Sequence, residues 1–396
     1  MFDKKTTYNN KVKTFRILQP AVFFILLVCL SACSGRTRQN RQEGDTIRMQ
    51  YAKQLTMVDY GGYTRVEIAN PWKAGQVLHT YLLVPKGEAG DKVASQLQSQ
   101  SGVIDIVRVP VERSIVFTSA HCQLLYYLGR QKAITGVCDL DYINIPQLHA
   151  CKDIVDCGQS MQPTVEKIVA ASPEVLLISP FENAGYGQLE KTGIPIIETA
   201  DYMETSALGR AEWMKFYGLL FGARDEAEKL FVTVDKEYGE LCGKAAKMPK
   251  GRSILTERKT GNVWYVPGGE STMGVMLRDA NAAYIYSSDK HSGSLSQPVE
   301  QILDHAADID VWAIKYYDGN TSTQDQLMSQ KALLQEYDGY KNLKAFQKGE
   351  IYECNTAKVP LFEETAFRPE LMLRELILLT HPDAGLGELR YYKKLK

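Results

Sequence analysis

One phrase occurs twice in this chain, and it constrains the fold more than any other feature. "QPTVEKIVAASPEVLLI" begins at Gln162, and "QPVEQILDHAADIDVWAI" begins at Gln297. Each copy combines the pattern of a short apolar helix with an apolar run typical of a buried strand. Glu166 and Glu300 occupy the same place in the two copies. A helix and a strand repeated in this way predict two lobes of similar architecture, one in each half of the chain.

Strand patterns alternate with helix patterns around both copies. In the first half, the strands are expected at 114–118, 133–137, 174–179 and 193–199, and in the second half at 253–257, 262–268 and 308–314. Such alternation predicts parallel sheets covered by helices, which bind ligands at the carboxyl ends of their strands. Residues 206–246 lack proline and carry apolar residues at helical spacing. They predict one helix of about 60 Å, or two helices joined near Gly222, connecting the lobes.

The N-terminus has the layout of an export signal. Several lysines and Arg16 precede the apolar run "AVFFILLVCL", which is short for a permanent membrane span. The following "LSAC" resembles the lipobox of bacterial lipoproteins, in which Cys33 would be acylated and become the new N-terminus. An ordinary signal peptide is the alternative. The lipobox predicts a periplasmic protein that is lipid-anchored to a bacterial membrane.

Composition limits the partners. Apolar residues make up 44% of the chain and charged residues 23%, as in an ordinary globular protein. The formal net charge of -1 gives no electrostatic reason to expect nucleic acid as a partner. In an oxidising compartment Cys151 and Cys157 could close a short disulfide loop, whereas at least three of the six cysteines that follow Cys33 are expected to be buried free thiols.

These features together resemble the substrate-binding lipoproteins of ABC importers for iron siderophores, haem and cobalamin, the class III periplasmic binding proteins. The resemblance covers about residues 105–380 and is carried by the lipobox, "VPVERSIVFTSAHCQLLYYLG", "GQSMQPTVEKIVAASPEVLLI", "TGIPIIET", the long helix and "SQPVEQILDHAADIDVWAI". It implies an α/β fold of two Rossmann-like lobes with parallel sheets, joined by one long backbone helix, with the ligand between the lobes. It also implies that Glu166 and Glu300 dock on arginines of the permease, because a two-fold permease presents the same basic patch twice.

The resemblance further implies a monomer without catalytic activity, cofactor or resident metal, whose partners are an ABC importer permease and a metal chelate such as a ferric siderophore or cobalamin. The predicted organisation is a signal peptide with lipobox at 1–33, a tether at 34–50, a small β-rich N-terminal extension at 51–100, an N-terminal α/β lobe at 101–205, the bridging helix at 206–246 and a C-terminal α/β lobe at 247–396. The extension lies outside the resemblance.

Loops that follow the predicted strands are expected to line the cleft. Aromatic planes suit flat, apolar chelates, and arginines pair with anionic complexes. The predicted ligand-binding residues are Ser119, His121, Asp141, Tyr142, Phe181, Arg258, Trp264, Tyr265, His291, Tyr316 and Arg368.

Four other functions stay open. Free zinc or manganese would need converging histidines and carboxylates, and the six histidines are scattered, although His121 keeps the idea open. Haem would need an axial tyrosine or histidine, and Tyr142, Tyr316, His121 or His291 could supply it. Cobalamin would also fit an aromatic cleft. An enzyme of chelatase-like fold is the alternative from another class, but the chain contains no GxSxG, P-loop, GxGxxG or HExxH motif.

Overall fold

The computed structural model describes residues 44–98, 105–183, 185–318 and 328–395. The predicted signal peptide, Cys33 and most of the predicted tether therefore lie outside the described residues. Within the described ranges, no helix is both long and apolar enough to cross a membrane.

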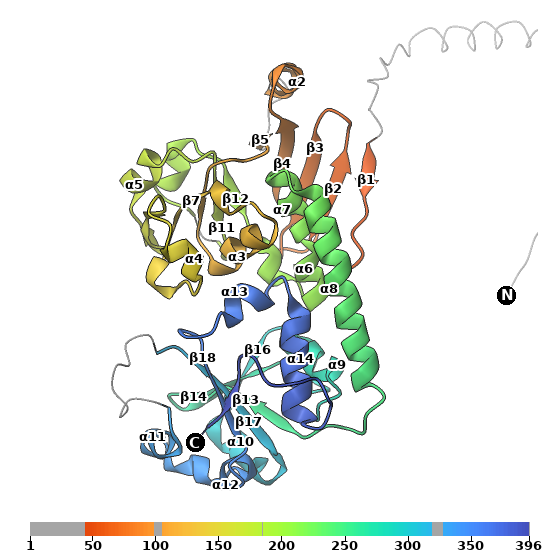
Figure 1. Ribbon diagram of the computed structural model, residues 1–396, viewed down its shortest axis with the longest axis vertical. Helices are drawn as coiled ribbons and strands as arrows, with labels where there is room; N and C mark the ends of the chain where they lie inside the picture. Colours follow the sequence, from red (N-terminus) through yellow and green to blue (C-terminus); the bar gives the residue numbers. More distant parts are fainter. Residues whose placement is uncertain (1–43, 99–104, 184, 319–327, 396) are drawn as a thin grey trace, which may run out of the picture. The chain divides into compact units, whose positions relative to one another are not determined.

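The N-terminal lobe is built on a five-stranded parallel sheet (Figure 1). Its strands, in spatial order, are β12 (Ile196–Glu198), β11 (Val175–Ile178), β6 (Ser114–Val116), β7 (Ile134–Val137) and β8 (Val155–Asp156). Helices α3 (Ser119–Tyr127), α4 (Pro146–His149) and α5 (Val165–Ala170) connect them. The chain order reverses between β6 and β11, and such a reversal is where a doubly wound sheet binds ligands.

The C-terminal lobe repeats this plan with a smaller sheet. Strands β13 (Ile254–Thr256), β17 (Val311–Tyr316) and β18 (Ile351–Asn355) are parallel, and β19 (Lys393–Lys394) adds an antiparallel edge. Its helices are α9 (Thr272–Asp279), α10 (Val299–Asp304), α11 (Gln330–Glu336), α12 (Lys344–Gln347), α13 (Leu361–Thr365) and α14 (Pro369–Thr380).

One predicted strand of this lobe lies outside the parallel sheet. The expected strand at 262–268 is β15 (Val263–Pro267), which pairs antiparallel with β14 (Lys259–Thr260) and β16 (Ser294–Pro298). The turn at Gly261, where φ is +59°, reverses the chain between β14 and β15. Such a tight reversal forms a hairpin and leaves no room for the helical crossover that parallel pairing needs.

The repeated phrase has the same structure in both lobes. Each glutamate, Glu166 or Glu300, is the second residue of its helix, and the isoleucine two positions later, Ile168 or Ile302, is completely buried. Each following strand lies in a parallel sheet, β11 between β6 and β12, and β17 between β13 and β18. The prediction of two lobes of similar architecture is confirmed.

The connection between the lobes consists of three helices. These are α6 (Ala207–Glu212), α7 (Met214–Leu220) and α8 (Arg224–Ala245). The chain turns at Gly222, where φ is +65°, and α6 and α7 are separated at Trp213. The prediction of one continuous helix is therefore wrong, whereas its alternative, a break near Gly222, is confirmed. Helix α8 has 22 residues and is about 33 Å long, shorter than a continuous helix over the whole segment. Its Phe231 packs in the core next to the N-terminal lobe, and its Tyr238 packs in the core of the C-terminal lobe.

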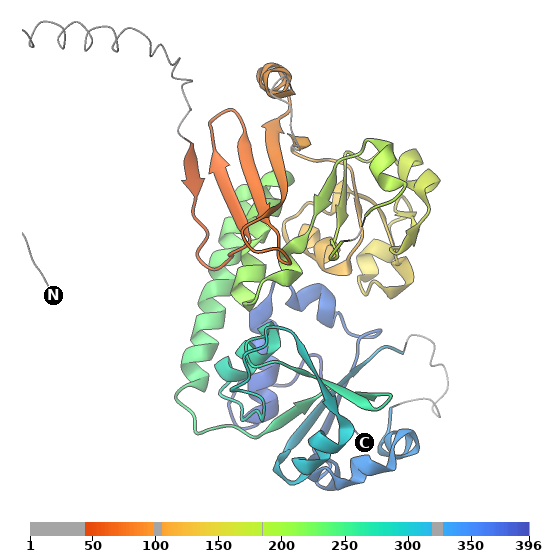
Figure 2. The same ribbon diagram turned by 180° about the vertical axis from the view of Figure 1, so that it is seen from behind.

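The N-terminal extension is larger than predicted. It is a five-stranded sheet of β1 (Asp45–Ile47), β2 (Leu55–Asp59), β3 (Thr64–Ala69), β4 (Val77–Pro85) and β5 (Asp105–Val109), with helix α2 (Glu88–Gln98). Strand β1 falls within the predicted tether, and β5 falls within the predicted N-terminal lobe. Both belong to the extension instead, because their backbone hydrogen bonds are made with β2 and β4 of this sheet. Figure 2 shows the sheet beside α8, and its buried Met57 and Tyr81 share a core with Phe216 of α7.

Two buried carboxylates attach this extension to the connecting helices. Glu212, which is completely buried, accepts hydrogen bonds from the backbone N–H groups of Gln50, Tyr51 and Ala52 at 2.7–3.0 Å. Glu204 accepts from Gln54 N–H at 2.9 Å and from Trp213 Nε1 at 3.0 Å. The chain between β1 and β2 is therefore held at a fixed position by groups distant in sequence.

A histidine couples the extension to the N-terminal lobe. His79 lies 3.1 Å from Asp105 and 3.3 Å from Glu198, and its side chain is 20% exposed. Burial alone would lower the pKa of His79, but hydrogen bonds to the two carboxylates and their charges raise it to about 9. Protonated His79 thus stabilises the fold fully below about pH 6.5, the pKa of an unfolded histidine, and this contribution is lost as the pH rises through 9.

We expect His79→Gln to lower the free energy of unfolding by about 2–3 kcal/mol at pH 6 and by much less at pH 10. Urea denaturation of both proteins at pH 6, 8 and 10 measures the difference. A difference that stays the same at all three pH values would show that protonation of His79 does not stabilise the fold.

The cysteines in the described ranges are all free thiols. Cys122, Cys138, Cys157 and Cys354 are buried, which confirms the expectation for at least three thiols. The disulfide considered between Cys151 and Cys157 is absent among the described residues, because Cys151 is exposed whereas Cys157 is enclosed in the core of the N-terminal lobe.

Candidate functional site

The two lobes contact each other through loops at the carboxyl ends of their strands. The rings of Tyr142 and Tyr317, one from each lobe, have centroids 5.0 Å apart, and the Tyr317 hydroxyl donates to the Asp141 carbonyl at 3.3 Å. The backbone N–H of Asn144 donates to Glu363 Oε1 at 3.1 Å. These contacts border the region where both sheets present their ligand-binding edges.

A cavity of about 210 Å³ lies between the connecting helices and the C-terminal lobe. We call it the inter-lobe cavity. Its lining residues are Ala207, Arg210, Thr272, Met273, Met276, Lys315, Leu361, Phe362, Thr365, Ala366, Pro369 and Met372. The walls are mostly apolar, and the two cationic side chains come from opposite sides, Arg210 from α6 and Lys315 from β17.

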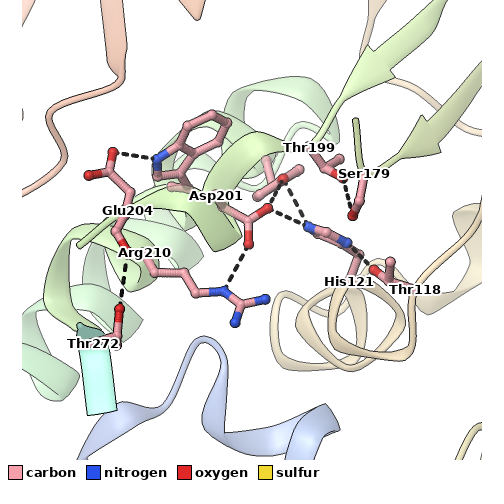
Figure 3. A network of polar contacts seen from close by, with 10 residues as sticks. Thr118, His121, Ser179, Thr199, Asp201, Glu204, Arg210 and Thr272 are labelled. Atoms are coloured by element: carbon pink, nitrogen blue, oxygen red, sulfur yellow. Dashed lines mark hydrogen bonds and ion pairs between the residues drawn. The ribbon is translucent and has the colours of Figure 1, made fainter. Parts of the chain in front are cut away.

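Arg210 is held by a buried hydrogen-bond network (Figure 3). Asp201, which is completely buried, accepts from Arg210 Nε at 3.0 Å, from His121 Nε2 at 2.8 Å and from the Tyr217 hydroxyl at 2.9 Å. Burial alone would raise the pKa of Asp201, but the charges of His121 and Arg210 and the hydrogen bonds from His121 and Tyr217 hold this pKa at about 2. Asp201 is therefore a carboxylate that fixes the direction of the Arg210 side chain.

Lys315 has a similar arrangement in the other lobe. Its Nζ pairs with Glu257, the residue that follows β13. Glu257 has a φ of +66°, a conformation that costs a non-glycine residue energy and is found most often where the surrounding structure imposes it. Its carbonyl accepts a hydrogen bond from the Trp312 indole N–H at 2.7 Å, which helps hold this conformation.

Two further pockets lie at the carboxyl ends of the sheets. The N-lobe pocket, of about 340 Å³, is lined by Phe117, Ser160, Met161, Pro163, Val165, Ile178, Ser179, Phe181, Gly185, Tyr186, Gly187, Gln188 and Leu189. The C-lobe pocket, of about 270 Å³, is lined by Arg258, Tyr316, Tyr317, Asp318, Met328, Ala332 and Glu336. In each pocket exposed rings such as Phe181 and Tyr317 stand beside polar groups.

Several predicted ligand-binding residues lie in or beside these pockets. Phe181, 56% exposed, lines the N-lobe pocket, and Arg258 and Tyr316 line the C-lobe pocket. Asp141 and Tyr142 are exposed and contact Tyr317. The structure therefore brings five predicted residues to the surfaces that face the other lobe or border a pocket.

The remaining predicted ligand-binding residues lie elsewhere. Trp264 is completely buried among Trp312 and Tyr340, and its indole N–H donates to the Thr256 carbonyl, so this position does not fit contact with a ligand. His121 is 2% exposed, because Thr118, Asp201 and Tyr217 surround its ring. Both side chains are parts of the core, and the apolar and polar partners that enclose them come from distant parts of the chain.

Four predicted residues have surface or helix-end positions. Arg368 precedes α14 and pairs with Glu370 and with Glu237. His291 is exposed and contacts Asp289 at 3.1 Å. Tyr265 is 47% exposed on β15, and Ser119 is the half-buried first residue of α3, at the carboxyl end of β6. None of these four lines a pocket defined above.

The two predicted docking residues are exposed. Glu166 lies on α5 and Glu300 on α10, and neither forms an ion pair with any residue in the described ranges. Neither lines a pocket defined above. The described residues also contain no group of three or more histidine, cysteine, aspartate or glutamate side chains arranged to hold a metal ion.

Sequence reasoning missed most of the inter-lobe cavity. Arg210, Met276 and Phe362 lie in helices, whereas the predicted ligand-binding residues were expected in loops that follow strands. The sequence gives only a weak signal that Asp201 and Arg210 pair. The two residues are nine positions apart, and this separation does not by itself bring two side chains together. Lys315 stands at the end of a buried strand, which was a stronger signal.

The comparisons with known proteins agree on one family. The family model of periplasmic binding proteins matches residues 115–357, more than half of the chain. An uncharacterized lipoprotein, MJ0878, of Methanocaldococcus jannaschii is 22% identical over 365 residues, which cover 87% of this chain and 84% of the relative.

Two solved structures share the fold. A periplasmic heme-binding protein of Pseudomonas aeruginosa, 16% identical, superposes with a TM-score of 0.54 over 72% of this chain and 98% of that one. A petrobactin-binding protein of Bacillus subtilis, 19% identical, has a TM-score of 0.50 over 69% of this chain and 93% of the other. With a family model matched from β6 to the end of β18, the chain belongs to the family of periplasmic binding proteins.

Proposed function

We propose that the protein captures an iron chelate between its lobes and delivers it to the permease of an ABC importer. The observation that carries this proposal is the set of exposed aromatic and apolar side chains at the facing edges of the two lobes. These are Tyr142, Met161 and Phe181 from the N-terminal lobe and Tyr317 and Phe362 from the C-terminal lobe, all at least 47% exposed. Exposed apolar side chains that gather around pockets mark a binding surface for a ligand with apolar faces.

Polar donors beside these rings support an iron chelate as the ligand. Arg258 lines the C-lobe pocket and pairs there with Glu336, and Arg210 reaches the inter-lobe cavity. Guanidinium groups bind the oxygen atoms that anionic iron complexes present. The solved relatives named as petrobactin-binding and heme-binding proteins support the same class of ligand.

Heme is the second candidate for the ligand. The hydroxyl group of tyrosine can serve as an axial ligand to heme iron, and Tyr316 and Tyr317 both line the C-lobe pocket. Cobalamin would use the same aromatic surfaces. The three ligands differ in mass and in absorption spectrum, so one preparation distinguishes them.

The proposal is tested by native mass spectrometry of the full-length protein purified from iron-limited cells without added ligand. We expect a second mass peak that exceeds the protein mass by that of one iron chelate, and an absorption band that disappears when the protein is unfolded and filtered. Protein from iron-replete cells is the control. A protein that carries no ligand from either culture, and binds none of a panel of ferric siderophores, heme and cobalamin, would contradict the proposal.

Delivery requires anchoring and docking, and we propose one residue for anchoring and two for docking. Cys33 would carry the lipid that holds the protein at the membrane, a role supported by the relatives that are named lipoproteins. Glu166 and Glu300 would contact arginines of the permease. Their matched positions on α5 and α10, both exposed and outside the pockets, support this role.

A further inference from the structure

Two cationic side chains approach the inter-lobe cavity from opposite sides. Arg210 belongs to α6, and Lys315 lies in β17 of the C-terminal lobe. Each is paired with one acidic residue, Asp201 for Arg210 and Glu257 for Lys315. Both acidic residues follow the ends of strands, β12 and β13, so the two sheets themselves determine where the cations point.

Arg210 keeps most of its hydrogen-bonding capacity for another partner. Its Nε donates to Asp201, whereas its Nη1 and Nη2 atoms donate to no residue in the described ranges. Its side chain is 29% exposed, and in Figure 3 the end of the guanidinium group points away from Asp201. A planar guanidinium with two free terminal nitrogens matches the two oxygen atoms of a carboxylate.

The shape of the cavity limits what can bind. About 210 Å³ is below the usual volume of a site for a complete small-molecule ligand, so the cavity holds only a side group of a larger chelate. Its walls include the apolar side chains of Met273, Met276 and Leu361, and an apolar surrounding strengthens a charge-assisted hydrogen bond made beside it. An acidic side group satisfies the free donors, whereas an apolar one would leave them unpaired.

We propose that the inter-lobe cavity binds a carboxylate group carried by the chelate, with Arg210 and Lys315 as its donors and Asp201 as a positioning residue for Arg210. This inference rests on the proposed function, since it names the class of chelate that the cleft selects. Porphyrins with carboxylate side chains and siderophores with a free carboxylate share this chemistry.

The test compares each acidic chelate with its own ester. The first pair is hemin and hemin dimethyl ester, and the second is the ferric complex of succinylated desferrioxamine and its methyl ester. Dissociation constants are measured for the full-length protein in detergent by fluorescence quenching. All variants are measured in the same micelles, so each probe partitions into detergent to the same extent in every measurement. For each protein, the dissociation constant of the ester is divided by that of the acid. Partitioning therefore cancels when these ratios are compared between proteins.

We expect the wild-type protein to bind the acid of one pair at least about 10-fold more tightly than the ester, and Arg210→Gln to reduce this ratio to about 1 with little change for the ester. The pair that shows the preference identifies the source of the carboxylate. Arg278→Gln, which changes an exposed arginine of α9 outside the cavity, should keep the wild-type ratio. Lys315→Gln tests the second donor, on the other side of the cavity, and remains informative if Arg210→Gln does not fold.

A further pair of variants tests whether Asp201 positions Arg210. Asp201→Asn should lower the ratio about 3-fold or more, and adding it to Arg210→Gln should change the ratio no further, because it acts through Arg210. A general loss of stability would weaken acid and ester equally. Two results would overturn the carboxylate site while leaving the proposed function intact. One is equal binding of acid and ester in both pairs by the wild-type protein. The other is a preference for the acid that survives in both Arg210→Gln and Lys315→Gln. Binding of none of the four probes would also overturn the carboxylate site, whereas the proposed function is contradicted only if the protein carries no chelate from cells as well.

Discussion

Replacing Glu212 by Ala is expected to lower the free energy of unfolding by about 4 kcal/mol. The Glu212 carboxylate is completely buried, accepts hydrogen bonds from three consecutive backbone N–H groups, Gln50 to Ala52, and pairs with Lys215 at 3.0 Å. Burial alone would raise the pKa of Glu212, but these backbone N–H groups and Lys215 lower it, so the side chain is ionised in the folded protein. Alanine would leave the N–H groups and the Lys215 ammonium without their acceptor.

Urea denaturation measures the effect, and the chain offers a matched control. Glu228 also pairs with Lys215, at 3.6 Å, but its side chain is 42% exposed. Glu228→Ala should therefore change stability by less than about 1 kcal/mol. Glu212→Gln, which keeps one acceptor oxygen, should fall between the two. Equal effects of Glu212→Ala and Glu228→Ala would show that the carboxylate does not hold the extension in place.

The fold was predictable where neighbouring residues determine it. The repeated motif Val–Glu–x–Ile, which ends at Ile168 and at Ile302, predicted both helices, and the apolar runs after them predicted the parallel strands. Gly222 marked the break in the connecting helices for an equally local reason. The extension was underestimated, since β1 and β5 are defined by pairing with β2 and β4, and the Glu212 contacts span about 160 residues of sequence.

The candidate site was harder to predict because burial depends on distant partners. Phe181 and Tyr142 could be placed at the carboxyl ends of strands from the sequence alone. Trp264 has the same aromatic character, but it lies on the inner face of β15, whereas its neighbour Tyr265 is on the outer face. Successive side chains of a strand point to opposite faces of its sheet, and the sequence does not predict which face of β15 packs against Trp312 and Tyr340.

Changing both Glu166 and Glu300 to Lys is expected to reduce uptake of the chelate by at least about 100-fold while leaving its affinity for the protein unchanged. Each charge-assisted contact with an arginine contributes about 1.5–3 kcal/mol, and a lysine in its place adds repulsion from the basic patch. Affinity should stay the same because neither glutamate lines a pocket defined above. Each single change to Ala should cause a smaller loss of uptake.

The control variant changes the net charge by the same amount, but through substitution of two other exposed glutamates. Glu88→Lys combined with Glu240→Lys alters α2 and α8, away from the helices of the repeated phrase. This control should transport the chelate at nearly the wild-type rate. Any loss of uptake that it shares with the Glu166 and Glu300 variant would be a general effect of charge and not of docking.

We propose that one surface of this protein holds the chelate and another delivers it to the permease. The most direct test measures the dissociation constant of the chelate and its rate of uptake on the same Glu166→Lys/Glu300→Lys protein. We predict an unchanged dissociation constant together with a rate of uptake at background level. A weakened dissociation constant with normal association to the permease would place these glutamates in the ligand site and contradict the claim.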